Sequence, residues 1–167
     1  MTSTTLSSKE THNLPPTRLA ESNPRHLSVR TWLRLYACSN LIEQQIQQKL
    51  RTQYGTTLAR FDFLAQLVRQ PEGLKMNVLS KKLMVSGGNI TGLTDQLVKE
   101  GLVIRKDDPH DRRSYLLICT DEGKKEFAEM AKSHEIWVSE IMQDLGMQEI
   151  EQLYASLDHL KNLLTSQ

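Results

Sequence analysis

The chain has 167 residues, of which 38% are hydrophobic, 5% aromatic and 25% charged. This length fits one domain, or one domain with an added dimerisation element. The low aromatic content favours packed aliphatic helices over a β-sandwich. The formal net charge of +1 does not identify a partner. A nucleic-acid binder of this composition would therefore need its basic residues gathered on one face.

The two cysteines and the N-terminal segment bear on the cellular compartment. Cys38 and Cys119 lie far apart and have no metal-type or CxxC spacing, which predicts reduced thiols and a cytoplasmic protein. Cys38 falls in an apolar helical stripe, so we expect it to be buried. Residues 1–26 are rich in Ser, Thr, Asn and Pro and lack a signal-peptide layout, which predicts a disordered arm. No apolar run has membrane-spanning length.

The first half of the chain shows helical periodicity. Apolar residues recur at helical spacing up to Tyr54, so residues 27–56 are predicted to form a long N-terminal dimerisation helix. Thr57 is a typical cap for a second helix, which Pro71 would end.

Two further helices follow closely. A short one is expected over residues 77–83, and a longer one is expected from a cap at Ser86 to Gly101. Only Met84 and Val85 separate them. A short helix, a tight turn and a second helix with a polar outer face indicate a helix-turn-helix.

The periodicity then changes from helix to strand. Residues 102–106 and 114–119 are expected to be strands, joined by a polar turn over residues 107–113. The resulting hairpin would be the wing of a winged helix-turn-helix DNA-binding domain covering residues 57–120.

The C-terminal part is again helical. Thr120 is expected to cap a fifth helix with an apolar stripe reaching Leu145, and Gly146 separates it from a last helix. Apolar stripes at both ends of the chain exceed what a small winged domain can cover, so we expect residues 121–167 and the first helix to form a homodimer. The predicted fold is mainly α with a small β-hairpin wing (α+β).

The predicted fourth helix is the candidate for reading DNA. An α-helix fits the major groove, where an asparagine such as Asn89 can contact adenine. Its candidate DNA-binding residues are Ser86, Gly87, Gly88, Asn89, Thr91, Gln96 and Lys99. The glycines Gly87, Gly88 and Gly92 indicate that the backbone approaches another surface closely, which is either DNA or a neighbouring helix.

The predicted wing carries two adjacent arginines, Arg112 and Arg113, at its tip. An arginine on a projecting tip can enter a narrow minor groove, and Asp111 could orient Arg113 through a charge-assisted hydrogen bond. The alternative is a solvated turn with a weak surface ion pair. Next to a helix-turn-helix, the DNA-binding interpretation is favoured.

Residues 85–103 resemble the recognition helix of the MarR family of bacterial regulators. The run Asp-Pro-His-Asp-Arg-Arg over 108–113, followed by 117–123, resembles that family's wing and the start of its next helix. The resemblance extends from Trp32 to Leu164. It implies a triangular homodimer on a pseudo-palindromic operator, usually a repressor that a small ligand releases. By that analogy Arg113 is the minor-groove residue and Asp111 orients it.

Two positions depart from patterns within that family. Many members have an arginine where this chain has Gly92, so base readout is expected to use Asn89, Thr91 and Gln96. An oxidant-sensing branch has a cysteine where this chain has Trp32, so a thiol switch is not expected.

The resemblance also implies an effector, expected to be a small aromatic acid or its acyl-CoA thioester. Aromatic rings could hold its ring and guanidinium groups its carboxylate. The candidate ligand-binding residues are Trp32, Arg34, Tyr36, Arg60, Phe63 and His134. Core packing or a surface charge is the alternative for each.

Other classes of function find less support in the sequence. It has no phosphate loop, activated nucleophile or zinc ligand set, so neither an enzyme nor a cofactor is predicted. A winged-helix protein–protein interaction module that binds no operator remains the alternative function.

Overall fold

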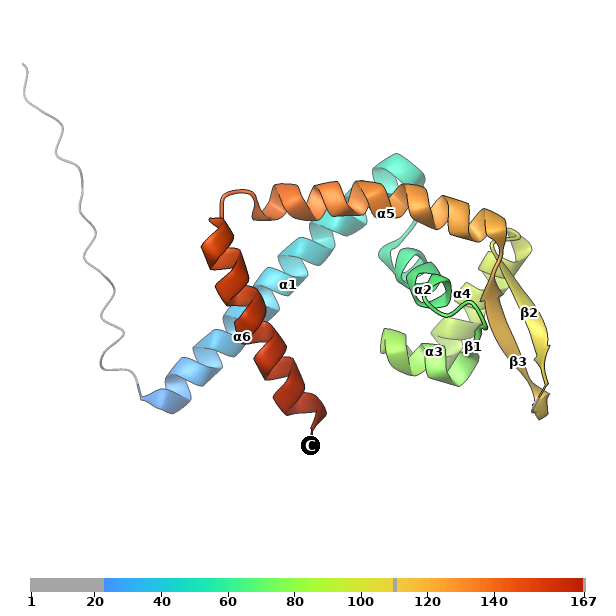
Figure 1. Cartoon of the computed structure of the whole chain (residues 1–167), viewed down its shortest axis with the longest axis horizontal. Helices are drawn as coiled ribbons and strands as arrows, with labels where there is room; N and C mark the ends of the chain where they lie inside the picture. The colour runs from blue at the N-terminus through green and yellow to red at the C-terminus, as the bar shows by residue number, and fades with distance from the viewer. Residues whose placement is uncertain (1–22, 110, 167) are drawn as a thin grey trace, which may run out of the picture. The chain divides into compact units, whose positions relative to one another are not determined.

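The structure is a computed structural model that describes residues 23–109 and 111–166, apart from the side chains of 111–113. Most of the expected N-terminal arm, residues 1–22, lies outside the described residues. The chain divides into two units, residues 1–38 and 39–167, and each is described by itself. Helices and a small antiparallel sheet make up the described part (Figure 1), which confirms the predicted fold class.

Helix α1 spans Pro24–Tyr54 and therefore begins before the predicted limit of the arm at residue 26. The side chain of Asn23 accepts a hydrogen bond from the Arg25 amide at 3.0 Å, as a helix cap does. Pro24 occupies the first helical position. The φ angle of proline suits a helix, and the amide N–H that proline lacks would have no partner at this position. Cys38, expected to be buried, is exposed in the single chain, because the apolar stripe around it has no partner within residues 23–38.

Helix α2 spans Leu58–Val68 and supplies much of the core. The Thr57 hydroxyl accepts a hydrogen bond from the Arg60 amide, which confirms the predicted cap. The core of the second unit joins α2 to the end of α1, the sheet and α5. Its fully enclosed side chains include Leu50, Phe63, Leu64, Leu67, Leu79, Ile90, Leu97, Val103, Leu117 and Met130.

The helix-turn-helix consists of α3, Met76–Leu83, and α4, Gly87–Lys99. Met84 adopts a left-handed conformation with φ of 53° and ends α3. The Ser80 hydroxyl donates to the Val85 carbonyl at 2.7 Å and holds the turn. The Ser86 hydroxyl then accepts from the Asn89 amide, so the predicted cap of α4 is confirmed.

Three antiparallel strands form a sheet in the order β1-β3-β2. Strand β2 spans Val103–Asp108 and β3 spans Asp111–Cys119, and together they make the predicted hairpin. The expected turn over 107–113 was too long, because both strands continue into it. The two-residue strand β1, Leu74–Lys75, pairs with Leu117 and Leu116 of β3 and was not predicted. Two residues are too few to show the alternation that marks a strand.

Helix α5 spans Asp121–Met142, and Thr120 caps it as predicted. Leu145, expected in its stripe, lies beyond its end, because the helix stops before Gly146. Helix α6, Met147–Thr165, has no buried residue. The Tyr54 hydroxyl at the end of α1 lies 2.7 Å from the Ser133 hydroxyl on α5 and fixes these two helices together. No helix of residues 23–166 combines the length and apolarity needed to cross a membrane.

Candidate nucleic-acid interface

Helix α4 has one buried edge and one open face. Ile90, Thr94 and Leu97 face the core, which is the edge that helical spacing from Ile90 predicts. All seven candidate DNA-binding residues at this helix are exposed: Ser86, Gly87, Gly88, Asn89, Thr91, Gln96 and Lys99. The helix therefore offers a continuous polar surface to a partner.

The three glycines of α4 leave open space. A Cβ atom built at Gly87, Gly88 or Gly92 would meet nothing within 4 Å. Packing against a neighbouring helix of the described chain therefore does not explain them. Gly88 and Gly92 instead line a hollow of about 440 Å³, whose other walls are Ala59, Val85, Asn89, Leu93 and Gln96. Gly92 comes three residues after Asn89, and Gln96 comes four residues after Gly92. These spacings place the three residues in one stripe along the helix.

Two ion pairs fix α4 to its neighbours. Arg60 on α2 binds Glu100, which follows the last turn of α4, through both of its terminal nitrogens. Arg105 on β2 binds Asp95 on α4. The hydrogen bond from Arg60 lowers the pKa of Glu100 below its ordinary value. Together these pairs set the orientation of the open face.

The turn end of the wing is tied to strand β1, which directly precedes the helix-turn-helix, by a pair that the sequence did not reveal. Asp108 is buried at the end of β2, and its carboxylate lies 2.6 Å from the Lys75 amine on β1. The Ser114 hydroxyl donates to the same carboxylate at 3.1 Å. A buried carboxylate requires such partners. Lys75 and Asp108 are 33 positions apart, so no local pattern pairs them.

The tip of the wing lies partly outside the described residues. The backbone of 111–113 belongs to β3, but the side chains of Asp111, Arg112 and Arg113 are not among those described. Their predicted roles in the minor groove therefore stay predictions. The structure does place these three residues at the turn end of the hairpin.

The candidate ligand-binding residues are divided between the two units, and the three in the second unit have other contacts. Phe63 is fully enclosed in the core, which favours the packing alternative. Arg60 is engaged by Glu100, and the His134 ring stacks on Phe61 with centroids 4.9 Å apart. The other three candidates, Trp32, Arg34 and Tyr36, are exposed in the first unit.

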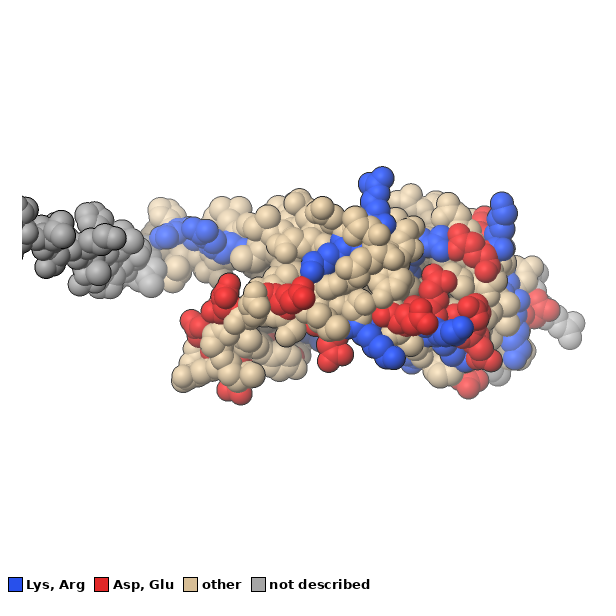
Figure 2. All heavy atoms as spheres, turned by 90° about the horizontal axis from the view of Figure 1, so that it is seen from above, with Lys and Arg blue, Asp and Glu red and all other residues tan. Residues whose placement is uncertain are grey.

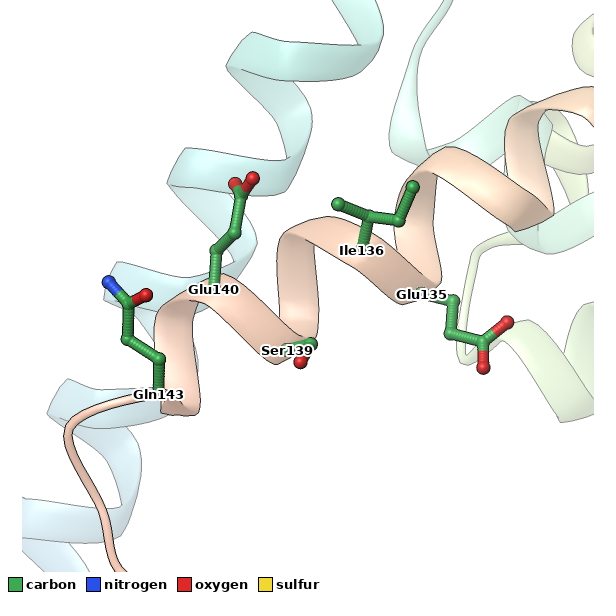
Figure 3. Close-up of a pocket in the computed structure, with 5 residues that line it drawn as sticks. All are labelled: Glu135, Ile136, Ser139, Glu140 and Gln143. Atoms are coloured by element: carbon green, nitrogen blue, oxygen red, sulfur yellow. The ribbon is translucent and has the colours of Figure 1, made fainter.

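On the face that Figure 2 shows, acidic and basic side chains are intermingled over the right-hand part of the view, with no large basic patch there. A hollow of about 350 Å³ on the outside of α5 is lined by Glu135, Ile136, Ser139, Glu140 and Gln143 (Figure 3). One helix supplies all of these residues, and Glu140 is already paired with Lys49 at 2.8 Å. This hollow therefore encloses no ligand-sized space between elements.

Comparison with known proteins connects this geometry to a family. Residues 54–114, from the end of α1 to the wing, match the model of the MarR family. Over 144 residues the chain is 28% identical to the transcriptional activatory protein BadR of Rhodopseudomonas palustris, covering 82% of each chain. A MarR-family regulator from Silicibacter pomeroyi has a TM-score of 0.72 at 28% identity, covering 86% of this chain and 99% of the other.

The chain thus resembles the MarR family over residues 54–114, and its fold is that of a MarR-family regulator of known structure. Its curated relatives are transcriptional regulators. CouR from Rhodococcus jostii RHA1, whose structure was solved with p-coumaroyl-CoA bound, has a similar fold. Its TM-score to this chain is 0.67 at 22% identity, covering 80% of this chain and 93% of CouR. Within the matched residues, α3 and α4 form the helix-turn-helix, and the β2–β3 hairpin lies in the position of the wing.

Proposed function

We propose that this chain is a MarR-family regulator that binds a pseudo-palindromic operator as a homodimer, with α4 in the major groove and the wing arginines in the adjacent minor groove. The observation that carries the proposal is the open face of α4. Asn89 and Gln96 are exposed on either side of Gly92, where a Cβ atom would meet no atom of the described chain within 4 Å. Their amide groups suit bidentate contacts with adenine, and the glycine lets the helix backbone come close to the bases.

Exposed apolar residues at both ends of the chain support the homodimer. In the first unit, large apolar side chains are exposed at Leu27, Val29, Trp32, Leu33 and Tyr36. On α6 they are exposed at Met147, Leu153, Tyr154, Leu157, Leu160, Leu163 and Leu164. A second copy of the chain would remove these surfaces from water, as symmetric partners commonly do. The proposed organisation is therefore dimerisation by residues 27–56 and 121–167 around a DNA-binding domain at 57–120.

The proposed regulation is repression released by a small effector. The family resemblance implies repression, and an aromatic acid or its acyl-CoA thioester is the effector class that it implies. CouR, which shares the fold, binds p-coumaroyl-CoA. A releasing effector must bind the DNA-free conformation more tightly than the DNA-bound one. Calorimetry with and without operator tests this: equal effector affinity in both states would contradict the proposed release.

Operator binding is tested by selecting fragments from a random duplex library and titrating the best one at several salt concentrations. We expect log affinity to fall linearly with log salt, with a slope of about −0.9 for each phosphate contacted. Half-sites should lie about one helical turn apart. The alternative, a protein–protein interaction module, predicts no selected sequence and no salt-dependent DNA affinity. A monomer in analytical ultracentrifugation would contradict the homodimer.

A further inference from the structure

A second hollow lies beside the reading helix, within the second unit of the chain. It measures about 270 Å³ and is lined by Glu43, Leu58, Ala59, Asp62, Leu83, Val85 and Leu93. These residues come from α1, α2, α3, the turn and α4. Elements distant in sequence thus line it, unlike the hollow on α5. Apolar side chains line most of it, as in pockets for small molecules.

The only two ionisable residues that line this hollow are both carboxylic acids. The Ser39 hydroxyl donates to Glu43 at 3.5 Å. Asp62 is half-buried, and no described group forms a hydrogen bond or ion pair with its carboxylate. A carboxylate removed from water without a partner is costly. The hollow therefore contains negative charge that the described side chains do not neutralise by direct contact.

The pKa of Asp62 reports the same imbalance. Burial raises this pKa above its ordinary value, and the charge of Glu43 raises it further. His134 and Arg69 act in the opposite direction, but the net shift is upward. An anionic ligand in the hollow would meet two like charges. A cation would lower the energy of both carboxylates.

We propose that this hollow binds an organic cation with an apolar body, its positive group lying between Glu43 and Asp62 and its apolar part against Leu58, Leu83 and Leu93. Charge complementarity selects the cation, and the leucines select an apolar body over a hydrated metal ion. The aromatic acid that the family resemblance implies has the wrong charge for this hollow.

The hollow also adjoins the proposed DNA-reading face. Ala59, Val85 and Leu93 line both it and the glycine-lined hollow on α4. A molecule bound between Glu43 and Asp62 would therefore contact residues that also line the hollow on the reading face of α4. The regulatory consequence, altered operator affinity, rests on the proposed function, whereas cation binding itself does not.

Isothermal titration calorimetry of the full chain tests the site with benzyltrimethylammonium as the cation and benzoate as an anion with the same ring. We expect the ammonium to bind and benzoate to bind at least about tenfold more weakly. Asp62→Asn and Glu43→Gln should each weaken ammonium binding by about tenfold, as expected for loss of a charged partner. Glu135→Gln, which removes an exposed carboxylate on α5, should leave it unchanged.

Several outcomes would overturn the proposal: no ammonium binding, equal binding of both ions, or undiminished binding to Asp62→Asn and Glu43→Gln. Circular dichroism and urea melts of each variant confirm folding, and the isosteric Asn and Gln keep the local shape. A chain that binds the ammonium but no selected duplex would contradict the proposed function and leave the site intact. A chain that binds an operator but not the ammonium would contradict only the site.

Discussion

The Arg60 guanidinium on α2 donates to both carboxylate oxygens of Glu100, with Nη1 lying 2.8 Å from Oε1. Glu100 directly follows the recognition helix, so this bidentate pair fixes the C-terminal end of α4. Asp95 and Arg105 provide a second connection, from α4 to the wing. The proposed reading helix is thereby held by charged groups at two points, in addition to its apolar edge.

Arg60→Lys keeps the positive charge but loses the planar fork that binds both oxygens. We expect the free energy of unfolding to fall by less than about 1 kcal/mol, because Glu100 is exposed and solvent screens the pair. Operator affinity should fall more than stability, because α4 would hold its orientation less firmly. Urea unfolding and operator titration measure the two effects. Lys124→Gln, which breaks an exposed ion pair with Asp121 within α5 and touches no ion pair of α4, should leave operator affinity unchanged.

Asp62→Asn should change how stability depends on pH. Because the folded-state pKa of Asp62 is raised, the folded chain binds more protons than the unfolded chain between about pH 3.9, the ordinary aspartate pKa, and the raised pKa. Stability from this residue is therefore lost as the pH rises from that value through the raised pKa. The variant should thus gain stability relative to the original chain at neutral pH, as measured by urea unfolding.

Glu100→Gln is the control of opposite sign. The folded-state pKa of Glu100 is lowered, so its contribution is present above the ordinary glutamate pKa and is lost as the pH falls through the lowered value. The variant should lose a small amount of stability at neutral pH and none in strong acid. The same sign of change for Asp62→Asn and Glu100→Gln would contradict both assignments.

Gly123→Ala should destabilise the chain by about 1–3 kcal/mol, the usual cost of overpacking. A Cβ atom at this position in the first turn of α5 would collide with the Leu102 carbonyl oxygen and lie 2.9 Å from Cys119 Sγ. Thermal unfolding measures the loss. In the matched variant Gly92→Ala on α4, the added Cβ atom would meet no atom within 4 Å. This variant should raise the free energy of unfolding by about 1 kcal/mol, because alanine favours the helix more than glycine does. Equal effects at both positions would show that the packing around Gly123 is looser than described.

Arg113→Ala should weaken operator binding by about 1–3 kcal/mol if this arginine contacts the minor groove. The salt dependence should also change, because one positive charge near the phosphates is removed. Titration of the selected duplex by fluorescence anisotropy at several salt concentrations measures both. Lys132→Ala, an exposed cation on α5, is the charge-matched control. Unchanged affinity for Arg113→Ala would remove the wing tip from the proposed mechanism.

Features set by neighbouring residues could be predicted from the sequence. The caps at Thr57, Ser86 and Thr120 were all located correctly, because each depends on a hydroxyl and an amide three residues later. The hairpin and the exposed face of α4 followed from periodicity in the same way.

Features set by distant residues could not be predicted. Strand β1 exists only through its pairing with Leu117 on β3. The Lys75–Asp108 pair and the hollow with Glu43 and Asp62 each combine elements far apart in sequence. Cys38 was assigned to a core because its stripe is apolar. A stripe identifies an apolar face, but it does not say whether the partner lies in the same chain.

The empty space over Gly92 has a consequence for how such regulators diverge. Substitutions at most reading positions replace one contact with another, but at Gly92 a side chain can be added with no rearrangement of the protein interior. Glycine codons become serine, arginine, alanine or valine codons by single nucleotide changes. If α4 reads the operator as proposed, a duplicated copy of this gene is one point mutation from a protein of the same fold with a changed reading face.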